Sequence, residues 1–244
     1  MSAPAGADGS AAPASPASQG AADAAASPLP FWRRRTGRIL RIALVALAVV
    51  ILSLAGYFYC CGALGANFHE VSPAPNALYR SAQLSSADLL ARVKALQVKT
   101  VLNLRGENPG KPWYDEEAAA LRAAGVRQID IKMSGKHMPT REKLAALIEA
   151  LDTAPRPILV HCQWGSDRTG LACAIERLEH GNDFAAARGE LAFFPYGHIR
   201  HFGYQSMDRV IDQFETYRQG GGALSLLAWA QQVYDPGADH DEVK

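Results

Sequence analysis

Cysteine is scarce in this chain, with four residues among 244. Cys60 and Cys61 are adjacent, so a bond between them would be strained, and they belong to no lipoprotein cleavage motif. The other two, Cys162 and Cys173, do not form a disulfide framework. The chain must therefore be stabilised by a hydrophobic core. A cysteine that stands in a distinctive sequence pattern is then a candidate for a chemical role.

Neither positive nor negative charge is in excess. The formal net charge is +1, and no strongly basic cluster stands out in the part that reads as globular. Nucleic-acid binding, which needs a clustered basic face, is therefore not expected. Residues 1–30 lack aromatic residues and contain mainly Ala, Pro, Ser and Gly, a composition that predicts a disordered tail. A short flexible tail is also expected at 236–244.

No charged residue occurs from Ile42 to Tyr59, and nearly every position there is apolar. Eighteen helical residues span about 27 Å, close to the thickness of a bilayer core. This pattern predicts a transmembrane anchor over 39–59, although a cleaved signal peptide or a buried helix is an alternative. A signal peptide usually has a shorter apolar region, of about 7–15 residues.

Lys and Arg are absent from Cys60 to Tyr79, whereas five arginines lie on the other side of the apolar stretch. The positive-inside rule then predicts a single-pass inner-membrane protein with a cytoplasmic N-terminus and a periplasmic, or extracytoplasmic, domain. A domain that faces the cytoplasm remains an alternative, since a reactive thiolate is easily oxidised outside. The five arginines are Arg33, Arg34, Arg35, Arg38 and Arg41.

Residues 67–235 alternate between strand and helix patterns, which predicts one α/β domain with a central, mostly parallel sheet of four or five strands flanked by helices. Two short edge strands are expected at 67–71 and 77–81. Further strands are expected at 99–105, 126–132 and 157–160, and helices at 85–96, 114–124, 140–151, 169–180, 183–193, 206–218 and 223–234.

The run from His161 to Gly170 is the most informative part of the chain. It follows the apolar strand 157–160 and leads into a helix, and Cys162 and Arg168 stand six positions apart within it. Amides of such a loop and the positive end of the following helix bind a phosphate dianion and favour a thiolate. Arg168 can hold two phosphate oxygens through its planar fork. A buried cysteine without chemistry is the alternative, but it leaves the surrounding pattern unexplained.

This run resembles the signature of the cysteine-dependent protein tyrosine and dual-specificity phosphatases, in the bacterial branch with His-Cys-x-x-Gly-x-Asp-Arg-Thr-Gly. The segments 78–84 and 101–105 resemble the entry to the same domain, so the resemblance covers about 67–180. It implies the compact fold of dual-specificity phosphatases and hydrolysis of phosphate monoesters through a cysteinyl-phosphate. A phosphoprotein, phospholipid or sugar phosphate would be the substrate, and no metal or cofactor is needed. An inactive, membrane-tethered phosphate-binding module is the alternative.

The resemblance implies a role for each residue of the run. Cys162 is the expected nucleophile, and Arg168 binds the phosphoryl oxygens. Thr169 is expected to donate its hydroxyl to the sulfur, and His161 to support the loop. Loop amides come from Gln163, Trp164, Gly165, Ser166 and Asp167.

The role of general acid has three candidates. Many relatives carry an aspartate on a separate loop, but 133–140 contains no Asp or Glu. Asp167 is the first candidate, because relatives with an Asp-Arg-Thr ending can supply the acid from inside the loop. Its alternative role is to brace Arg168 or the loop amides. Asp130 is the second, unless it only supports a strand end, and His137 is a distant third.

Several other residues keep two interpretations. Arg80 and Arg105 would bind a second phosphate or form surface salt bridges. Trp164 would line the substrate or pack, and Cys173 is either a buried core thiol or a resolving cysteine. His198 and His201 lie in an irregular stretch, and their spacing does not define a metal site.

Overall fold

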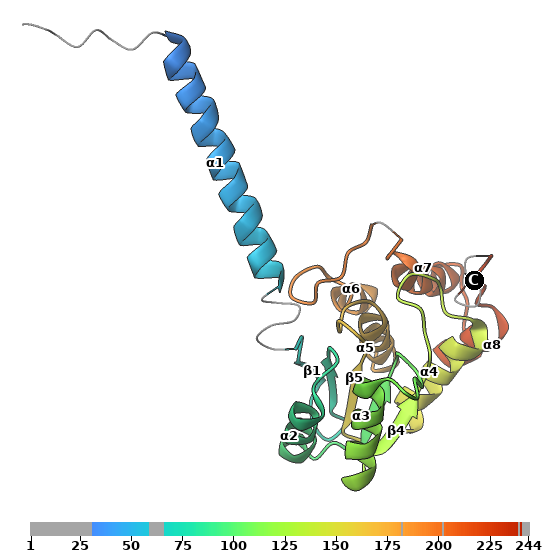
Figure 1. Cartoon of the computed structure of the whole chain (residues 1–244). Coiled ribbons are helices and arrows are strands. Elements are labelled where there is room, and N and C mark those ends of the chain that lie inside the picture. The colour runs from blue at the N-terminus through green and yellow to red at the C-terminus, as the bar shows by residue number, and fades with distance from the viewer. Residues whose placement is uncertain (1–30, 59–65, 182, 202, 239, 241–244) are drawn as a thin grey trace, which may run out of the picture. The chain divides into compact units, whose positions relative to one another are not determined.

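The computed structural model describes residues 31–58, 66–181, 183–201, 203–238 and 240 (Figure 1). It divides into a unit that ends at Val50 and a unit that begins at Ile51. The tail predicted for 1–30, the pair Cys60 and Cys61, and most of the tail predicted for 236–244 lie outside the described residues.

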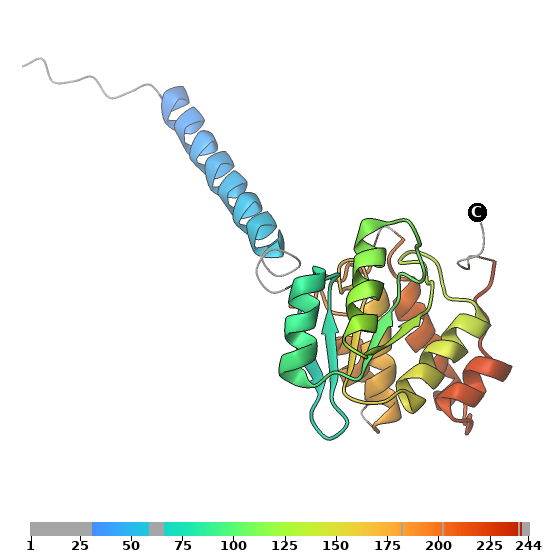
Figure 2. The same cartoon turned by 60° about the horizontal axis from the view of Figure 1, so that its bottom comes forward.

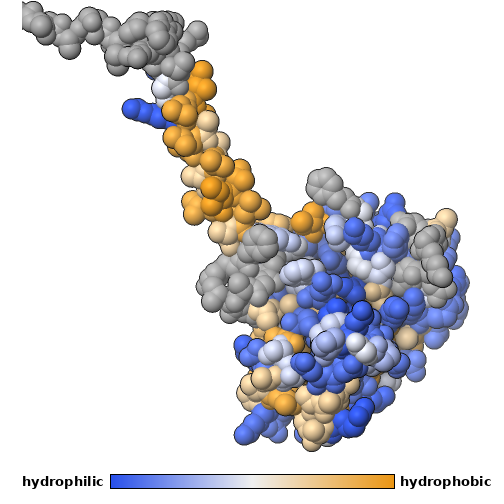
Figure 3. All heavy atoms as spheres, in the orientation of Figure 1, coloured by the Kyte–Doolittle hydropathy of each residue, from blue (hydrophilic) through white to orange (hydrophobic). Residues whose placement is uncertain are grey.

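Helix α1 (Phe31–Phe58) contains the apolar stretch. Its segment Gly37–Tyr57 has a mean hydropathy of 2.6 and is long and apolar enough to cross a membrane. Its large aliphatic side chains are exposed, and they form the continuous orange surface in Figure 3. Length and composition alone identify this segment, and a signal sequence near the N-terminus meets the same criterion.

The predicted α/β architecture is confirmed in the second unit, where five strands form one sheet in the order β1-β2-β5-β3-β4. β1 pairs with β2 antiparallel, and the other pairs are parallel. The strands are β1 (His69–Ser72), β2 (Leu78–Ser81), β3 (Thr100–Asn103), β4 (Arg127–Asp130) and β5 (Ile158–His161).

The prediction that 77–81 forms an edge strand is wrong, because β2 lies between β1 and β5. The side chains of Arg80 and Ser81 on this strand are buried. Glu190 supplies the countercharge that makes a buried Arg80 tolerable. That partner is 110 positions away, so a local pattern does not reveal it.

Seven helices surround the sheet in the described part of this unit (Figures 1 and 2). Ser85 caps the first of them by accepting a hydrogen bond from the Asp88 amide, as its position predicted. The helix expected over 183–193 ends earlier, at Gly189, since the following residues turn toward the loop after β5. The helices are α2 (Ser86–Leu96), α3 (Pro112–Ala123), α4 (Arg141–Thr153), α5 (Asp167–Glu179), α6 (Phe184–Gly189), α7 (Ser206–Gln219) and α8 (Leu226–Gln232).

Both faces of the sheet are covered, which explains why β5 is apolar at consecutive positions. Leu159 packs in a cluster with residues of α2 and α3. Ile158 and Val160 point the other way, into the larger cluster formed with α4, α5, α7 and α8. Helices on both faces leave the strand ends as the place where a ligand can approach.

Four residues lie side by side at the carboxyl ends of the parallel strands. His161 is in register with Ser81 on β2 and with Asn103 on β3, and Asn103 is in register with Asp130 on β4. Because Cys162 follows His161 directly, the sheet places the candidate nucleophile at this edge.

Candidate active site

The segment from Cys162 to Ser166 forms a tight loop between β5 and α5. Cys162 is buried, with 2% of its surface exposed. Gly165 has a φ of +70°, and a Cβ there would lie 2.7 Å from the Ala82 nitrogen. The loop therefore requires glycine at 165, both for its backbone conformation and for its close approach to β2.

Three consecutive carbonyl groups of this loop are held by surrounding residues. The bonds run from the Gln83 amide to Gln163 at 3.3 Å, from Asn67 Nδ2 to Trp164 at 3.0 Å, and from Arg80 Nη2 to Gly165 at 2.8 Å. Two of these donors come from β2 or the residues just after it, and the third precedes β1. The strands that order the sheet thus also order the loop.

This anchoring sets the direction of the loop amides. In a trans peptide the N–H points opposite to the C=O of the same unit. The amides of Trp164, Gly165 and Ser166 therefore point away from the three anchors. Within the described residues, no backbone N–H from 163 to 168 donates to a protein acceptor. The loop thus presents unpaired donors of the kind that bind oxyanions.

Arg168 lies in the first turn of α5, beside this loop, and is fixed at one nitrogen. Its Nη1 donates to the carbonyl oxygens of Leu104, at 3.3 Å, and Met133, at 3.1 Å. Its Nε is buried and has no hydrogen-bond partner in the described chain. The guanidinium is thereby oriented while Nε keeps its donor capacity for an oxyanion.

Thr169 follows Arg168 and is fully buried. Its Oγ1 makes no hydrogen bond within the described residues, so the predicted bond to the Cys162 sulfur stays a prediction. Ser166 is held on the outer side, where its Oγ donates to the Tyr196 carbonyl at 2.7 Å.

Arg80 neither lies on the surface nor is free to bind a second phosphate. Its Nη1 is 2.7 Å from Glu190 Oε2, and both side chains are buried. Its guanidinium also lies over the Tyr196 ring, with 3.6 Å from the guanidinium carbon to the ring centre. Arg80 is thus a buried brace between the sheet and the loop.

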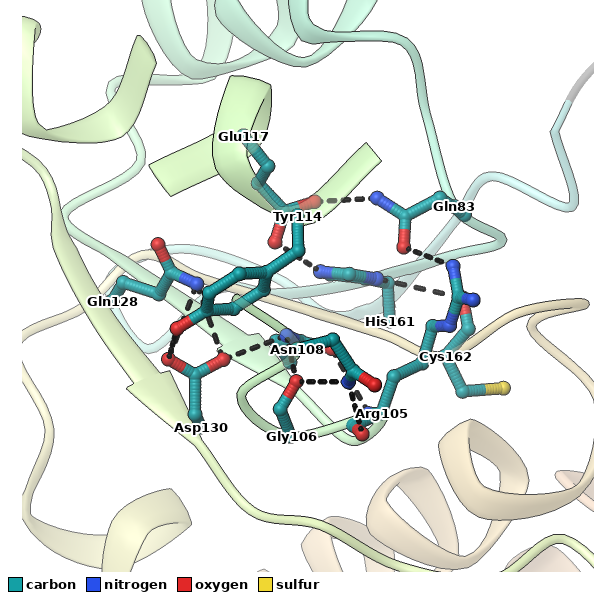
Figure 4. A network of polar contacts seen from close by, with 11 residues as sticks. Gln83, Arg105, Gly106, Asn108, Tyr114, Glu117, Gln128, Asp130, His161 and Cys162 are labelled. Carbon is teal, nitrogen blue, oxygen red and sulfur yellow. Dashed lines mark hydrogen bonds and ion pairs between the residues drawn. The ribbon is translucent and has the colours of Figure 1, made fainter. Parts of the chain in front are cut away.

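His161 is held by a buried carboxylate (Figure 4). Its Nε2 lies 3.1 Å from Glu117 Oε1 on α3, and Gln83 Nε2 donates to the other oxygen at 2.5 Å. Arg105 Nη1 continues this chain by donating to Gln83 Oε1 at 3.0 Å. His161 therefore connects the loop to α3.

Arg105 lies near the same edge and stacks on Trp113, 3.4 Å from the ring centre. Burial lowers its pKa, and the positive charge of Arg168 adds to that effect. The interaction shows that two guanidinium groups share this region. Such a pair concentrates positive potential where an anion would bind.

Asp130 lies on the far side of the network in Figure 4, and its two oxygens are occupied. It accepts hydrogen bonds from Asn103 at 2.6 Å, from Tyr114 at 3.1 Å and from Gln128 at 3.1 Å. Burial and the Asp130 charge raise the pKa of Tyr114 to about 12, so Tyr114 remains a donor. These contacts show that Asp130 supports the end of its strand. Strand β3 lies between Asp130 on β4 and the loop that follows β5.

Asp167 is the carboxylate nearest to the loop in sequence, and the structure gives it an unexpected partner. Its Oδ1 lies 2.8 Å from His198 Nδ1, and His198 Nε2 lies 2.7 Å from Asp208 Oδ2. Burial opposes a charge on His198, but the two carboxylates outweigh it and raise its pKa to about 9. His198 is therefore an imidazolium at neutral pH.

The segment 133–140, which lacks a carboxylate, nevertheless lies against the site. A Cβ on Gly135 would be 3.7 Å from Arg168 Nε and 3.9 Å from Asp167 Oδ2. The segment is held by Ser206, which donates to the Lys136 carbonyl, and by Tyr234, which donates to the Pro139 carbonyl at 2.9 Å. His137 belongs to this segment and is half-buried.

Cys173 lies on the buried face of α5 and is a free thiol. Burial raises its pKa to about 12, so it stays protonated at neutral pH. A protonated, fully buried thiol is a poor attacking group. These properties favour the core interpretation over a resolving cysteine.

Sequence reasoning did not find Glu117, Asp208 or Asn67 as parts of this site. Glu117 lies 44 positions from His161, and Asn67 lies 97 positions from Trp164. Asp208 lies only 10 positions from His198, but His198 itself had no assigned role. The one available signal was the irregular stretch 195–201, in which two histidines lie close together without an apolar period.

Comparison with known proteins shows what this fold and site are similar to. Residues 69–178 match the tyrosine phosphatase family. The dual specificity protein phosphatase TpbA of Pseudomonas aeruginosa strain PAO1 is 34% identical over 134 residues, covering 54% of this chain and 56% of TpbA. The protein of the same name from strain UCBPP-PA14 is 35% identical over 128 residues, covering 51% and 53%.

Among solved structures, that of P. aeruginosa TpbA is 25% identical, with a TM-score of 0.48, and the match covers 63% of this chain and 94% of that one. The chain spans about half the length of the curated relatives it matches. The family match over residues 69–178 and the two curated relatives support a phosphatase of the cysteine-dependent tyrosine and dual-specificity type.

Proposed function

We propose that the domain hydrolyses phosphate monoesters through a cysteinyl-phosphate on Cys162. The supporting observation is the loop itself, in which three anchored carbonyls turn consecutive amides the opposite way. Arg168 adds a buried Nε that has no partner in the described chain. These N–H donors are of the kind that binds the oxygens of a phosphoryl group.

In the first step the Cys162 sulfur attacks phosphorus as a thiolate. The S–P bond forms while the bond from phosphorus to the leaving oxygen breaks. Arg168 and the loop amides stabilise the charge on the three phosphoryl oxygens. Asp167 gives a proton to the leaving oxygen, which departs as an alcohol or phenol.

In the second step water attacks the phosphorus of the cysteinyl-phosphate. Asp167 accepts a proton from this water, the S–P bond breaks, and the thiolate is restored as inorganic phosphate leaves. The net reaction consumes one water per ester. It needs no electron transfer and no group beyond this chain.

Turnover of an aryl phosphate by the full chain in detergent tests this function. Cys162→Ser should abolish phosphate release, and Arg168→Lys should lower kcat/KM by about 10³-fold because bidentate binding is lost. Rapid quenching during turnover should yield a phosphorylated peptide containing Cys162. Binding of phosphate without any turnover would instead identify an inactive phosphate-binding module.

The substrate class has two candidates. The names of the curated relatives favour a phosphoprotein, since both are dual specificity protein phosphatases. A phospholipid is favoured by exposed aromatic residues next to the loop. Trp164 is 56% exposed, and Phe193 and Phe194 are 57% and 75% exposed. Asn67 Nδ2 joins these two regions by donating to the carbonyls of Trp164 and Tyr196.

A substrate panel separates these candidates. The full chain is assayed with a phosphotyrosine peptide, a phosphoserine peptide, a phosphatidic acid vesicle and a sugar phosphate. If the aromatic residues bind an apolar substrate, Trp164→Ala should raise KM for the vesicle about tenfold and leave KM for the sugar phosphate unchanged. If wild type and Trp164→Ala both hydrolyse the peptides faster than the vesicle or the sugar phosphate, the result would favour the phosphoprotein class.

The apolar part of α1 supports a single-pass anchor in the inner membrane, and the arginines before it support a cytoplasmic N-terminus with a periplasmic domain. A phosphatase reporter fused after Lys244 should then be active only outside the cytoplasm. Activity of a cytoplasmic reporter at the same position would reverse the orientation. Alkaline extraction distinguishes an anchor, which stays in the membrane fraction, from a cleaved signal peptide.

A further inference from the structure

His198 lies between two carboxylates, within the domain and next to the phosphate loop. Its two ring nitrogens are 2.8 Å from Asp167 and 2.7 Å from Asp208, and 1% of its surface is exposed. Asp208 is held on its other oxygen by Arg200 Nε at 2.7 Å. This row of four charged groups ends at the residue that begins α5.

The row has a defined protonation pattern. An imidazolium donates from both nitrogens, and here each nitrogen faces a carboxylate oxygen. Asp208 is paired with two cations, His198 and Arg200. Asp167 has one oxygen on His198, while its other oxygen lies toward Gly135 and Arg168. The outer oxygen is therefore on the side of the site.

The proposed chemistry needs a proton donor for the leaving oxygen, and this row of charged groups can supply one. An isolated aspartate is almost entirely ionised at neutral pH, because its ordinary pKa is about 3.9. A carboxylate cannot protonate a leaving oxygen. Segment 133–140 offers no other carboxylic acid, and Asp130 is a strand away with both oxygens occupied.

We propose that His198 is a positioning residue that orients Asp167 and supplies the proton Asp167 delivers to the leaving group, an inference that rests on the proposed phosphatase function. The N–H bond at His198 Nδ1 breaks as an O–H bond forms at Asp167 Oδ1. The carboxyl group turns about its Cβ–Cγ bond and passes this proton to the leaving oxygen. His198 is then neutral at Nδ1 and still bonded to Asp208 through Nε2.

The second step restores the starting state. Asp167 takes a proton from the attacking water and returns it to His198 Nδ1, so no proton is gained or lost over the cycle. His198 is buried and does not reach the substrate itself, and it acts only through Asp167. The charged groups that face the Asp167–His198 pair are Asp208 on α7, Arg200 on the preceding loop and Arg168 on α5.

The test uses two substrates that differ in their need for a proton. The full chain is assayed with an aryl phosphate whose phenol is acidic, and with an alkyl phosphate whose alcohol is a poor leaving group. For His198→Gln, kcat on the aryl phosphate should stay within about threefold of wild type. On the alkyl phosphate kcat should fall about 10²–10³-fold, the range expected for loss of general-acid catalysis.

The pH profile gives a second readout. Since the pKa of His198 is raised to about 9, wild-type kcat on the alkyl phosphate should persist up to about pH 9 and fall above it. In Asp208→Asn this fall should move to lower pH, because one of the two carboxylates that stabilise the cation is gone. In His198→Gln the fall near pH 9 should be absent.

A matched control is His180→Gln, at a partly exposed histidine beyond the C-terminal end of α5. It should leave both rates and both profiles unchanged. Equal losses on the two substrates for a folded His198→Gln protein would overturn the proposal and leave His198 a structural brace. An unchanged kcat of His198→Gln on both substrates would also overturn the proposal. Failure of Cys162→Ser to abolish aryl phosphate hydrolysis would instead refute the underlying phosphatase function.

Discussion

Arg80 Nη2 lies 2.8 Å from the carbonyl oxygen of Gly165, so a fully buried cation on β2 holds the tightest turn of the phosphate loop. The same guanidinium binds Glu190, which also pairs with Arg177 at 2.9 Å. Loop geometry and domain stability therefore depend on one ion pair inside the domain. This relationship makes separate predictions for stability and for catalysis.

Replacing Arg80 should destabilise the domain, because it leaves Glu190 buried with one partner fewer. Arg80→Met should lower the free energy of unfolding by about 3–5 kcal/mol, the usual cost of breaking a buried pair. The double variant Arg80→Met with Glu190→Leu should recover a large part of this loss. Denaturant unfolding of all three proteins measures both effects, and a double variant as unstable as the single one would contradict this account.

The hydrogen bond between His161 and Glu117 should stabilise the fold mainly because it satisfies buried polar groups, and less because of the charge on Glu117. Glu117→Ala leaves His161 Nε2 and Gln83 Nε2 without their acceptor, which should cost about 1–3 kcal/mol of stability. Glu117→Gln keeps an oxygen for one of them and should cost less. Thermal unfolding compares the two variants, and equal losses would show that the carboxylate charge decides.

Gly165→Ala should be far more damaging than alanine at another glycine of similar backbone conformation. Gly165 and Gly181 have φ values of +70° and +76°, but a Cβ meets backbone only at Gly165, while nothing lies within 4 Å at Gly181. Gly181→Ala should therefore cost about 1 kcal/mol, from the left-handed conformation alone.

For Gly165→Ala the backbone must also move, so unfolding should cost at least 2 kcal/mol more, of the order of other strained sites. Inhibition by inorganic phosphate should weaken in parallel, because the loop amides are displaced. Similar unfolding free energies for the two alanine variants would show that the contact with Ala82 is relieved without cost.

His198 should make the domain less stable in alkaline solution. Its pKa is raised from an ordinary 6.5 to about 9, so the folded state binds the proton more tightly than the unfolded state. The stabilisation is fully present below about pH 6.5 and is lost as the pH rises through about 9. It is on the order of 3 kcal/mol.

Chemical unfolding from pH 6 to 10 checks this expectation against His198→Gln, in which the titrating group is gone. The free energy of unfolding of the wild type should fall relative to the variant over this range. A constant difference between the two proteins would mean that the folded and unfolded states bind the His198 proton equally well.

Parts of the fold were predictable because local chemistry decides them. The apolar run before Cys162 was predicted as a strand, and helices were predicted at 85–96 and 140–151. Ser85 and Thr140 cap these two helices by accepting bonds from the amides of Asp88 and Lys143. The strand at 77–81 was misplaced at an edge, since the burial of Arg80 depends on a distant glutamate.

By itself the sequence determined the family signature, the alternation of strands and helices, and the candidate roles of Cys162 and Arg168, because residue type and spacing along the chain carry this information. Only the tertiary structure decided which side chains brace the loop and which one contacts Asp167. The pair Asp167 and His198 is 31 positions apart, joined by the packing of the segment after α6 against the start of α5. Contacts of this kind follow from the meeting of distant segments, and a linear pattern does not encode them.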